Sequence, residues 1–124
     1  MRLLLDTNAF LWWRDESPRL SERAGTEIRD SANNIFVSIV SFWEISIKRS
    51  LGKLRYSEDF EEVMAEEDFG LLGMNYTHLR TLEGLPRHHG DPFDRLLIAQ
   101  SSAEKLVVVT NDRVFARYAA ETLW

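Results

Sequence analysis

The sequence contains no cysteine, so it offers neither a disulfide framework nor a thiolate metal site, and a reducing compartment is compatible with it. It also lacks an apolar run long enough to span a bilayer and the layout of a secretory signal peptide. We therefore expect a cytoplasmic protein with no membrane association. An excess of positive charge is absent too: the net charge is −5, which excludes binding to nucleic acid through the overall field of the protein.

What is present is typical of one globular domain. The chain has 124 residues, of which 44% are hydrophobic and 28% charged. A chain of this length buries roughly two thirds of its unfolded surface in a single core. We expect one domain over residues 1–124.

Basic residues are concentrated locally at Lys48, Arg49, Lys53 and Arg55. They are either a patch that binds nucleic acid or cations that complement the negative C-terminus of a helix.

Short apolar runs alternate with helical patterns along the chain. Strands are predicted at residues 2–5, 35–40, 70–74, 106–110 and, at an edge, 120–124. Helices are predicted at residues 9–13, 21–30, 41–51, 57–67, 76–83, 92–105 and 113–118. This alternation predicts an α/β fold with a mostly parallel sheet covered on both faces. Ligands of such sheets bind beyond the carboxyl ends of the strands.

Two acids mark the start of the helix predicted at 92–105. Asp91 stands at the N-cap position, Pro92 fits the first helical position, and Asp94 follows at the third. One interpretation is that both acids only complement the positive end of the helix, which is worth under about 2 kcal/mol each.

Three further acids have a structural interpretation of this kind, with a shared functional site as the alternative. Asp6 and Asp112 directly follow apolar strands, where each is also a natural helix cap. Glu44 lies inside a helix among apolar residues and needs a partner if it is buried, for which Lys48 is one turn away. If the first and fourth strands are neighbours, Asp6, Asp94 and Asp112 meet at one edge of the sheet, and Glu44 reaches it from the next helix.

Such a cluster of carboxylates requires a cation, because like charges raise one another's pKa. Oxygen ligands without histidine or cysteine suit Mg²⁺ or Mn²⁺. The chemistry that follows is metal-assisted hydrolysis of a phosphodiester.

Four blocks of the sequence together resemble the motifs of PIN-domain ribonucleases, specifically the VapC toxins of bacterial toxin–antitoxin pairs. They are residues 3–8 (Leu-Leu-Leu-Asp-Thr-Asn), 43–48 (Trp-Glu-Ile-Ser-Ile-Lys), 91–100 (Asp-Pro-Phe-Asp-Arg-Leu-Leu-Ile-Ala-Gln) and 109–112 (Val-Thr-Asn-Asp). The resemblance implies a three-layer α/β/α fold and an endoribonuclease dependent on Mg²⁺ or Mn²⁺. It also implies an RNA substrate, a VapB-type antitoxin whose C-terminal segment covers the active-site groove, and a homodimer.

By position in these blocks, the metal-binding and catalytic acids would be Asp6, Glu44, Asp94 and Asp112. Asp91 precedes the third acid, and we interpret it as a helix cap, with direct metal contact as the alternative. Arg95 and Arg113, which stand beside acids, and Thr7 each have two possible roles. Arg95 and Arg113 would contact RNA phosphates or brace a neighbouring acid. Thr7 would orient Asp6 or a metal-bound water, or only begin a helix.

The histidines and tryptophans receive structural interpretations. We expect His78, His88 and His89 to face solvent without fixed partners and without a catalytic role. Trp12, Trp13 and Trp43 are interpreted as core or groove lining, with one of the adjacent pair 12 and 13 available to RNA or to the antitoxin.

Rival functions fit the sequence less well. A phosphatase of the haloacid dehalogenase type needs a second aspartate two residues after Asp6, where this chain has Asn8. A receiver domain needs a phosphoacceptor after its third strand, where this chain has Met74 and Asn75. The rival from another class is a catalytically idle interaction module that keeps the PIN fold.

Overall fold

The computed structural model describes residues 1–124, and its centre is a five-stranded parallel sheet. The strand order is β3-β2-β1-β4-β5, so β1 is central and its neighbours come from distant parts of the chain. The bounds are β1 Arg2–Leu5, β2 Asn34–Ser38, β3 Gly70–Leu72, β4 Val107–Val109 and β5 Thr122–Leu123. The predicted mostly parallel α/β sheet and the predicted edge strand are confirmed.

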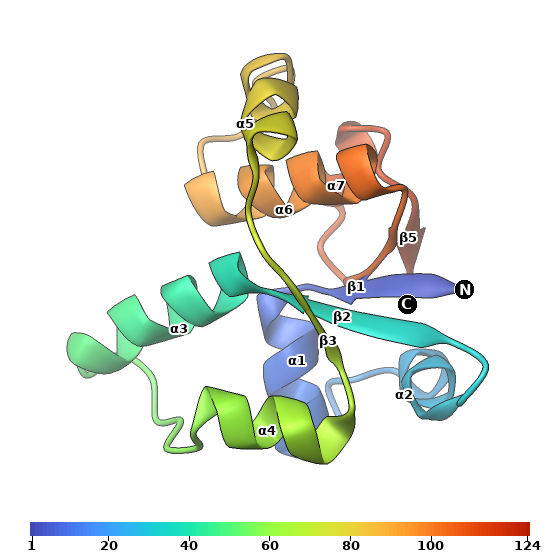
Figure 1. The fold of residues 1–124 in the computed structure, drawn as a ribbon, viewed down its shortest axis with the longest axis vertical. Coiled ribbons are helices and arrows are strands. Elements are labelled where there is room, and N and C mark those ends of the chain that lie inside the picture. The colour runs from blue at the N-terminus through green and yellow to red at the C-terminus, as the bar shows by residue number, and fades with distance from the viewer.

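Helices cover both faces of the sheet and give the three layers that the motifs implied. Figure 1 shows α1, α2 and α4 on one side and α5, α6 and α7 on the other, with α3 projecting from one edge. The bounds are α1 Thr7–Arg14, α2 Glu22–Arg29, α3 Ile39–Ser50, α4 Phe60–Glu67, α5 Tyr76–Glu83, α6 Pro92–Glu104 and α7 Val114–Arg117. None of these helices is long and apolar enough to cross a membrane.

The core is divided by β1, whose side chains alternate between the two faces. Leu3 and Leu5 belong to a cluster with Phe10 of α1, whereas Leu4 packs with Leu97 of α6. All five of these side chains are fully buried. The unbroken leucine run therefore reflects burial on both faces, as the sequence predicted.

The junction of β2 and α3 differs from the prediction. Residues up to 40 were expected in the strand, but β2 ends at Ser38 and α3 begins at Ile39. The reason is that the hydroxyl of Ser38 accepts a hydrogen bond from the amide of Val40 at 3.0 Å and caps the helix. Val40 is fully buried in the helix, so its packing outweighs its preference for a strand.

Three other elements are shorter than predicted, and for one of them the reason is again a cap. The helix expected from residue 57 begins at Phe60, because Asp59 accepts from the amide of Glu62 and acts as the N-cap. β3 ends at Leu72 rather than 74, and the last helix is the single turn α7.

Candidate active site

Asp6 lies at the carboxyl end of the central strand. Its backbone amide donates to Val109 of β4, and its side chain caps α1 by accepting from the amide of Ala9 at 2.7 Å. Asp6 is only 7% exposed, and this burial raises its pKa to about 6, with hydrogen bonds from Thr110 and Ala9 opposing the shift. The capping interpretation is thus correct for Asp6, but a cap alone does not require a buried carboxylate.

Glu44 lies on α3 and is buried with both oxygens engaged. Oε1 accepts from the hydroxyl of Thr7 at 2.8 Å, and Oε2 accepts from the ammonium of Lys48 at 2.7 Å. Lys48 is therefore the partner that the sequence predicted. Thr7 is the first residue of α1, as one of its two interpretations predicted. Its hydroxyl also holds Glu44, 37 positions away in the chain, because the start of α1 packs against α3.

Asp91 and Asp94 both lie at the start of α6, but their side chains have different partners. Asp91 Oδ1 accepts from the amides of Phe93 at 2.9 Å and Asp94 at 3.1 Å, so its predicted role as N-cap is confirmed. Asp94 is partly buried, and its Oδ2 lies 3.4 Å from His89 Nε2. Burial and then the charge of Asp91 raise the pKa of Asp94 to about 6, against the hydrogen bond of His89.

Asp112 is the exposed member of the set. It follows β4, and its Oδ1 accepts from the amide of Val114 at 3.0 Å at the start of α7. Its own amide donates to the hydroxyl of Thr110, which holds the turn after the strand. Asp112 therefore stabilises the turn immediately before α7, whose N-cap is Arg113 and has no side-chain capping hydrogen bond.

The negative charges of the four acids influence one another. Besides burial, the charges of Asp112 and Glu44 raise the pKa of Asp6, and those of Asp112 and Asp6 raise the pKa of Asp94. The side chains are not assembled into a cage, since no group of three or more histidine, cysteine or acidic side chains is close enough to hold an ion.

The donor set nevertheless fits a hard divalent cation. Mg²⁺ usually keeps several waters and takes only one or two carboxylates from the protein, so three direct ligands are not needed. The hydrogen bonds named above use Asp94 Oδ2 and Asp112 Oδ1, which leaves a second oxygen on each for such an ion. The raised pKa values of Asp6 and Asp94 show that two negative charges are poorly compensated here.

Sequence reasoning missed the environment of the histidines. The expectation of solvent-facing rings is wrong for His78, which is fully buried on α5 with Nε2 2.9 Å from Glu104. It is also wrong for His89, which contacts Asp94 and the hydroxyl of Tyr118. Burial lowers the pKa of His89, but the hydrogen bond and the charge of Asp94 oppose burial and contribute to a net rise. No local pattern pointed to Tyr118, because the contact joins positions 29 apart.

Arg95 has neither of the roles that were expected for it. It is buried, and its guanidinium donates to the carbonyl of Pro86 at 2.7 Å and to the hydroxyl of Tyr118 at 3.0 Å. It therefore holds the loop before α6 and does not face a phosphate or an acid of the site. Arg113 is exposed next to Asp112, so contact with a phosphate stays open for it.

The cluster of bases near the end of α3 is largely structural. Lys48 pairs with Glu44, and the guanidinium of Arg49 donates to the carbonyls of Tyr56 and Glu58. Lys53 and Arg55 are exposed and have no such partner, whereas Lys48 is exposed but paired. This favours the interpretation of helix-end cations over that of a broad patch for nucleic acid.

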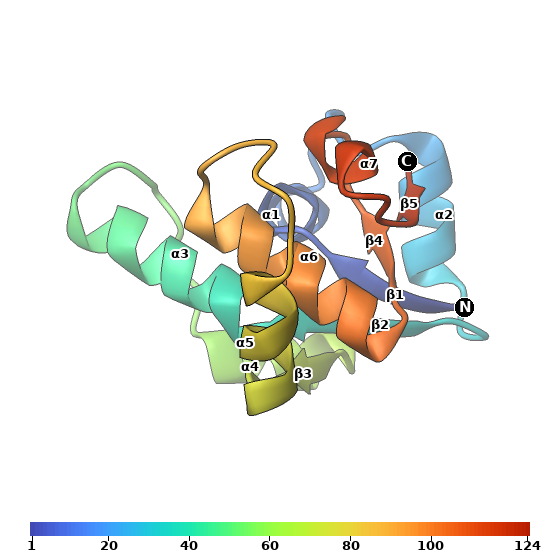
Figure 2. The ribbon, with the colours of Figure 1, turned by 90° about the horizontal axis from the view of Figure 1, so that it is seen from above.

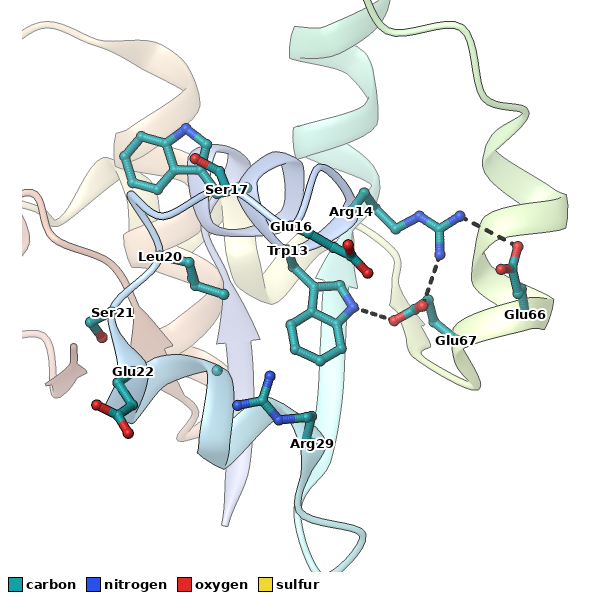
Figure 3. Close-up of a pocket in the computed structure, with 12 residues that line it drawn as sticks. Trp13, Arg14, Glu16, Ser17, Leu20, Ser21, Glu22, Arg29, Glu66 and Glu67 are labelled. Carbon is teal, nitrogen blue, oxygen red and sulfur yellow. Dashed lines mark hydrogen bonds and ion pairs between the residues drawn. The ribbon is translucent and has the colours of Figure 1, made fainter.

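A cavity of about 650 Å³ lies between α1, α2 and α4, and none of the four acids lines it. Figure 3 shows Arg14 bridging to Glu66 and Glu67, and the indole nitrogen of Trp13 directed at Glu67. Arg14, Glu66 and Glu67 are thus paired with one another. Trp12 is half-buried against Trp124, with ring centroids 5.8 Å apart.

Trp43 differs from the expected core or groove lining. It is 49% exposed on α3 and touches Phe93 of α6, with ring centroids 4.9 Å apart. In Figure 2 α6 lies beside α3, the helix that carries Glu44, and the contact of Trp43 with Phe93 joins α3 to the first turn of α6.

Comparisons with known proteins agree on the fold. The model of the PIN domain family matches residues 3–121. Among solved structures, VapBC2 from Rickettsia felis bound to a promoter DNA fragment has a similar chain, with 17% identity, a TM-score of 0.71 and coverage of 99% of this chain and 98% of that one. FitAcB from Neisseria gonorrhoeae has 15% identity, a TM-score of 0.65 and coverage of 98% and 96%. DNA-bound VapBC from Salmonella typhimurium has 17% identity, a TM-score of 0.63 and coverage of 99% and 97%. No curated protein matches the sequence.

Proposed function

This chain belongs to the PIN domain family, and on that premise we propose that it is a metal-dependent endoribonuclease, the toxin of a VapBC-type toxin–antitoxin pair. Residues 1–124 would act as one PIN domain. The observation that carries the proposal is the pair of poorly compensated carboxylates, Asp6 and Asp94, at the carboxyl edge of the sheet, each with a pKa raised to about 6. A cluster of this kind is expected where a cation and a phosphate bind.

The proposed site is held in place by the chain itself. Asp6, Glu44, Asp94 and Asp112 would hold Mg²⁺ or Mn²⁺. When bound, such an ion activates water and stabilises charge on the phosphate oxygens. The amide of Ala9 fixes Asp6, and Thr7 with Lys48 fixes Glu44. With Lys48 already compensating Glu44, the two acids that most need the ion are Asp6 and Asp94.

The direct test is cleavage of structured RNA by protein freed of any antitoxin. We expect cleavage with Mg²⁺ or Mn²⁺, and its loss when EDTA removes the ion. Cleavage that persists in EDTA would point to a contaminating nuclease and would reject the assignment. Full absence of cleavage with both ions would favour the alternative of an idle interaction module. Release of phosphate from small phosphomonoesters would favour a phosphatase of the haloacid dehalogenase type, although Asn8 stands where its second aspartate is needed.

A VapB-type antitoxin is the proposed protein partner. The support is that the similar chains come from VapBC and FitAB complexes, including a toxin–antitoxin complex from Klebsiella pneumoniae. An active ribonuclease would be toxic to its host, so the proposed activity itself calls for an inhibiting partner.

Homodimerisation is part of the same proposal, and an apolar stripe on α3 supports it. Four large side chains at every fourth position are between 36% and 61% exposed: Ile39, Trp43, Ile47 and Leu51. A helix in water with such a face is typical of an interface. A self-complementary stripe fits the two-fold contact of a dimer, in which the same surface serves both copies.

Ile47→Glu should therefore convert the dimer to a monomer, because it buries a charge in the middle of the stripe. The measurement is molar mass by light scattering after size-exclusion chromatography. Thr26→Glu is the matched control, since it places the same charge at an exposed position of α2. A wild-type protein that is monomeric at all accessible concentrations, or an Ile47→Glu variant that remains dimeric, would contradict this surface.

A further inference from the structure

The hydroxyl of Tyr118 is the centre of an unusual set of hydrogen bonds. Tyr118 is buried next to α7, and three N–H groups are directed at its oxygen. They are the amides of His88 at 3.2 Å and His89 at 3.1 Å and the guanidinium of Arg95 at 3.0 Å. Because a hydroxyl oxygen has two lone pairs, these donors use all of its capacity to accept.

The single hydrogen of this hydroxyl then has to find an acceptor. Two are within reach, namely Nδ1 of His89 at 2.8 Å and the carbonyl of His89 at 3.4 Å. The first distance is normal for an O–H donor, and it is clearly the shorter of the two. The hydroxyl of Tyr118 therefore donates to Nδ1.

This assignment determines which ring nitrogen of His89 carries hydrogen. In the neutral ring, an Nδ1 that accepts leaves the hydrogen on Nε2. In this tautomer the hydrogen on Nε2 is directed at Oδ2 of Asp94, at a long donor–acceptor distance of 3.4 Å. The ring also packs against Tyr118, with ring centroids 5.4 Å apart, which limits its rotation.

We infer that His89 is a positioning residue for Asp94, and that Tyr118 sets the tautomer and the orientation of His89. The inference rests on the proposed function for its catalytic consequence, but the hydrogen-bond chain can be tested without it. With Oδ2 of Asp94 held by His89, Oδ1 is the oxygen left for an ion. Groups that orient ligands in this way typically change metal affinity or activity by about 10- to 100-fold when they are removed.

The arrangement also explains why Arg95 is buried beside a candidate catalytic acid. Its guanidinium connects Tyr118 with the carbonyl of Pro86, so it ties the loop that carries His89 to the start of α6. The loop, the last helix and Asp94 are thereby joined through one phenol oxygen.

The first test is spectroscopic and needs neither RNA nor metal. In uniformly ¹⁵N-labelled protein, at a pH where the ring is neutral, we expect His89 to show a protonated Nε2 and an unprotonated, hydrogen-bonded Nδ1. Tyr118→Phe, which keeps the ring but removes the hydroxyl, should change the Nδ1 signal, and Asp94→Asn should change that of Nε2. A wild-type ring protonated on Nδ1 alone would overturn the inference, whatever the protein does to RNA.

The second test separates positioning from packing through kinetics of RNA cleavage. His89→Leu and Tyr118→Phe should each lower kcat by about 10-fold or more with little change in KM. His89→Gln should recover part of the loss, because its amide can still donate to Asp94. His88→Leu is the control, since His88 also packs on Tyr118, with ring centroids 4.8 Å apart, but its ring contacts no acid.

The outcomes distinguish failure of the positioning role of His89 from failure of the proposed ribonuclease function. If the wild type is active and His88→Leu lowers kcat as much as His89→Leu, packing of the loop explains the effect and positioning is rejected. If the wild type cleaves no RNA, the proposed function fails, and the ring signals alone decide whether His89 donates to Asp94.

Discussion

Asp6→Asn should lower the rate of RNA cleavage by about 100-fold or more while making the metal-free protein more stable. The loss of activity follows because an amide is a far weaker ligand than a carboxylate for a hard cation. The gain in stability follows because the buried carboxylate of Asp6, which is only 7% exposed, has its pKa raised to about 6 by desolvation. Asparagine carries no charge and can still cap α1 through the amide of Ala9.

The size of the gain and its dependence on pH follow from linkage. A folded pKa of about 6 against an ordinary value of 3.8 corresponds to roughly 3 kcal/mol. Between these values the folded state binds more protons than the unfolded state, so the stability of the wild type falls as pH rises. The advantage of Asp6→Asn should therefore be absent below about pH 4, grow between pH 4 and 6, and be complete near pH 7. Urea unfolding of both proteins in EDTA across this range measures it.

Asp59→Asn is the matched control for this prediction. Asp59 is also the N-cap of a helix, α4, but it is exposed and remote from the acids of the site. Its replacement should change neither cleavage nor the dependence of stability on pH. An Asp6→Asn variant that is less stable than the wild type at pH 7 would mean that the cap, and not the buried charge, dominates at this position.

Mg²⁺ or Mn²⁺ should stabilise the wild-type protein by about 2.7 kcal/mol at an ion concentration 100 times the dissociation constant. The reason is that the ion compensates the charges of Asp6 and Asp94, which burial otherwise penalises. Because both carboxyl groups have a pKa of about 6, they must lose protons to bind the ion, and the apparent affinity should fall steeply below pH 6.

The measurement is thermal unfolding with and without the ion at constant ionic strength. Asp94→Asn should remove most of the increase in Tm, whereas Asp30→Asn, an exposed position after α2, should retain it. An equal increase in the wild type and in Asp94→Asn would indicate that the ion acts elsewhere on this acidic protein.

The local part of the site was predictable from sequence. Asp91 and Asp6 form hydrogen bonds with amides two or three positions ahead, and such contacts depend on residue type and spacing alone. The partner of Glu44 was predictable for the same reason, since Lys48 lies one helical turn away. Boundaries were less reliable, as at Val40, where burial in α3 outweighed the preference of a β-branched residue for a strand.

Contacts between distant segments were not predictable in this way. Thr7 was expected to orient Asp6 or a metal-bound water, or only to begin a helix; it begins α1, but its hydroxyl also holds Glu44. Arg95 was expected to contact phosphates or to brace a neighbouring acid, but it holds the loop before α6. In both cases a polar side chain had several chemically suitable partners, and the packing of helices on the sheet selected one. The surroundings of His78 and His89 were missed because their partners come from α6 and from Tyr118 at the end of α7.

By itself the sequence determined the alternation of strands and helices, the caps that begin them and the acids that follow the strands, because these depend on propensity and on contacts within one turn. The tertiary structure alone decided which strands are neighbours, and hence that Asp6 at the end of β1 lies beside the turn after β4 that carries Asp112. It also decided that Asp94 is desolvated and faces a histidine held by a tyrosine. Burial and long-range hydrogen bonds arise only when the layers pack, and these set the pKa values on which the proposed chemistry depends.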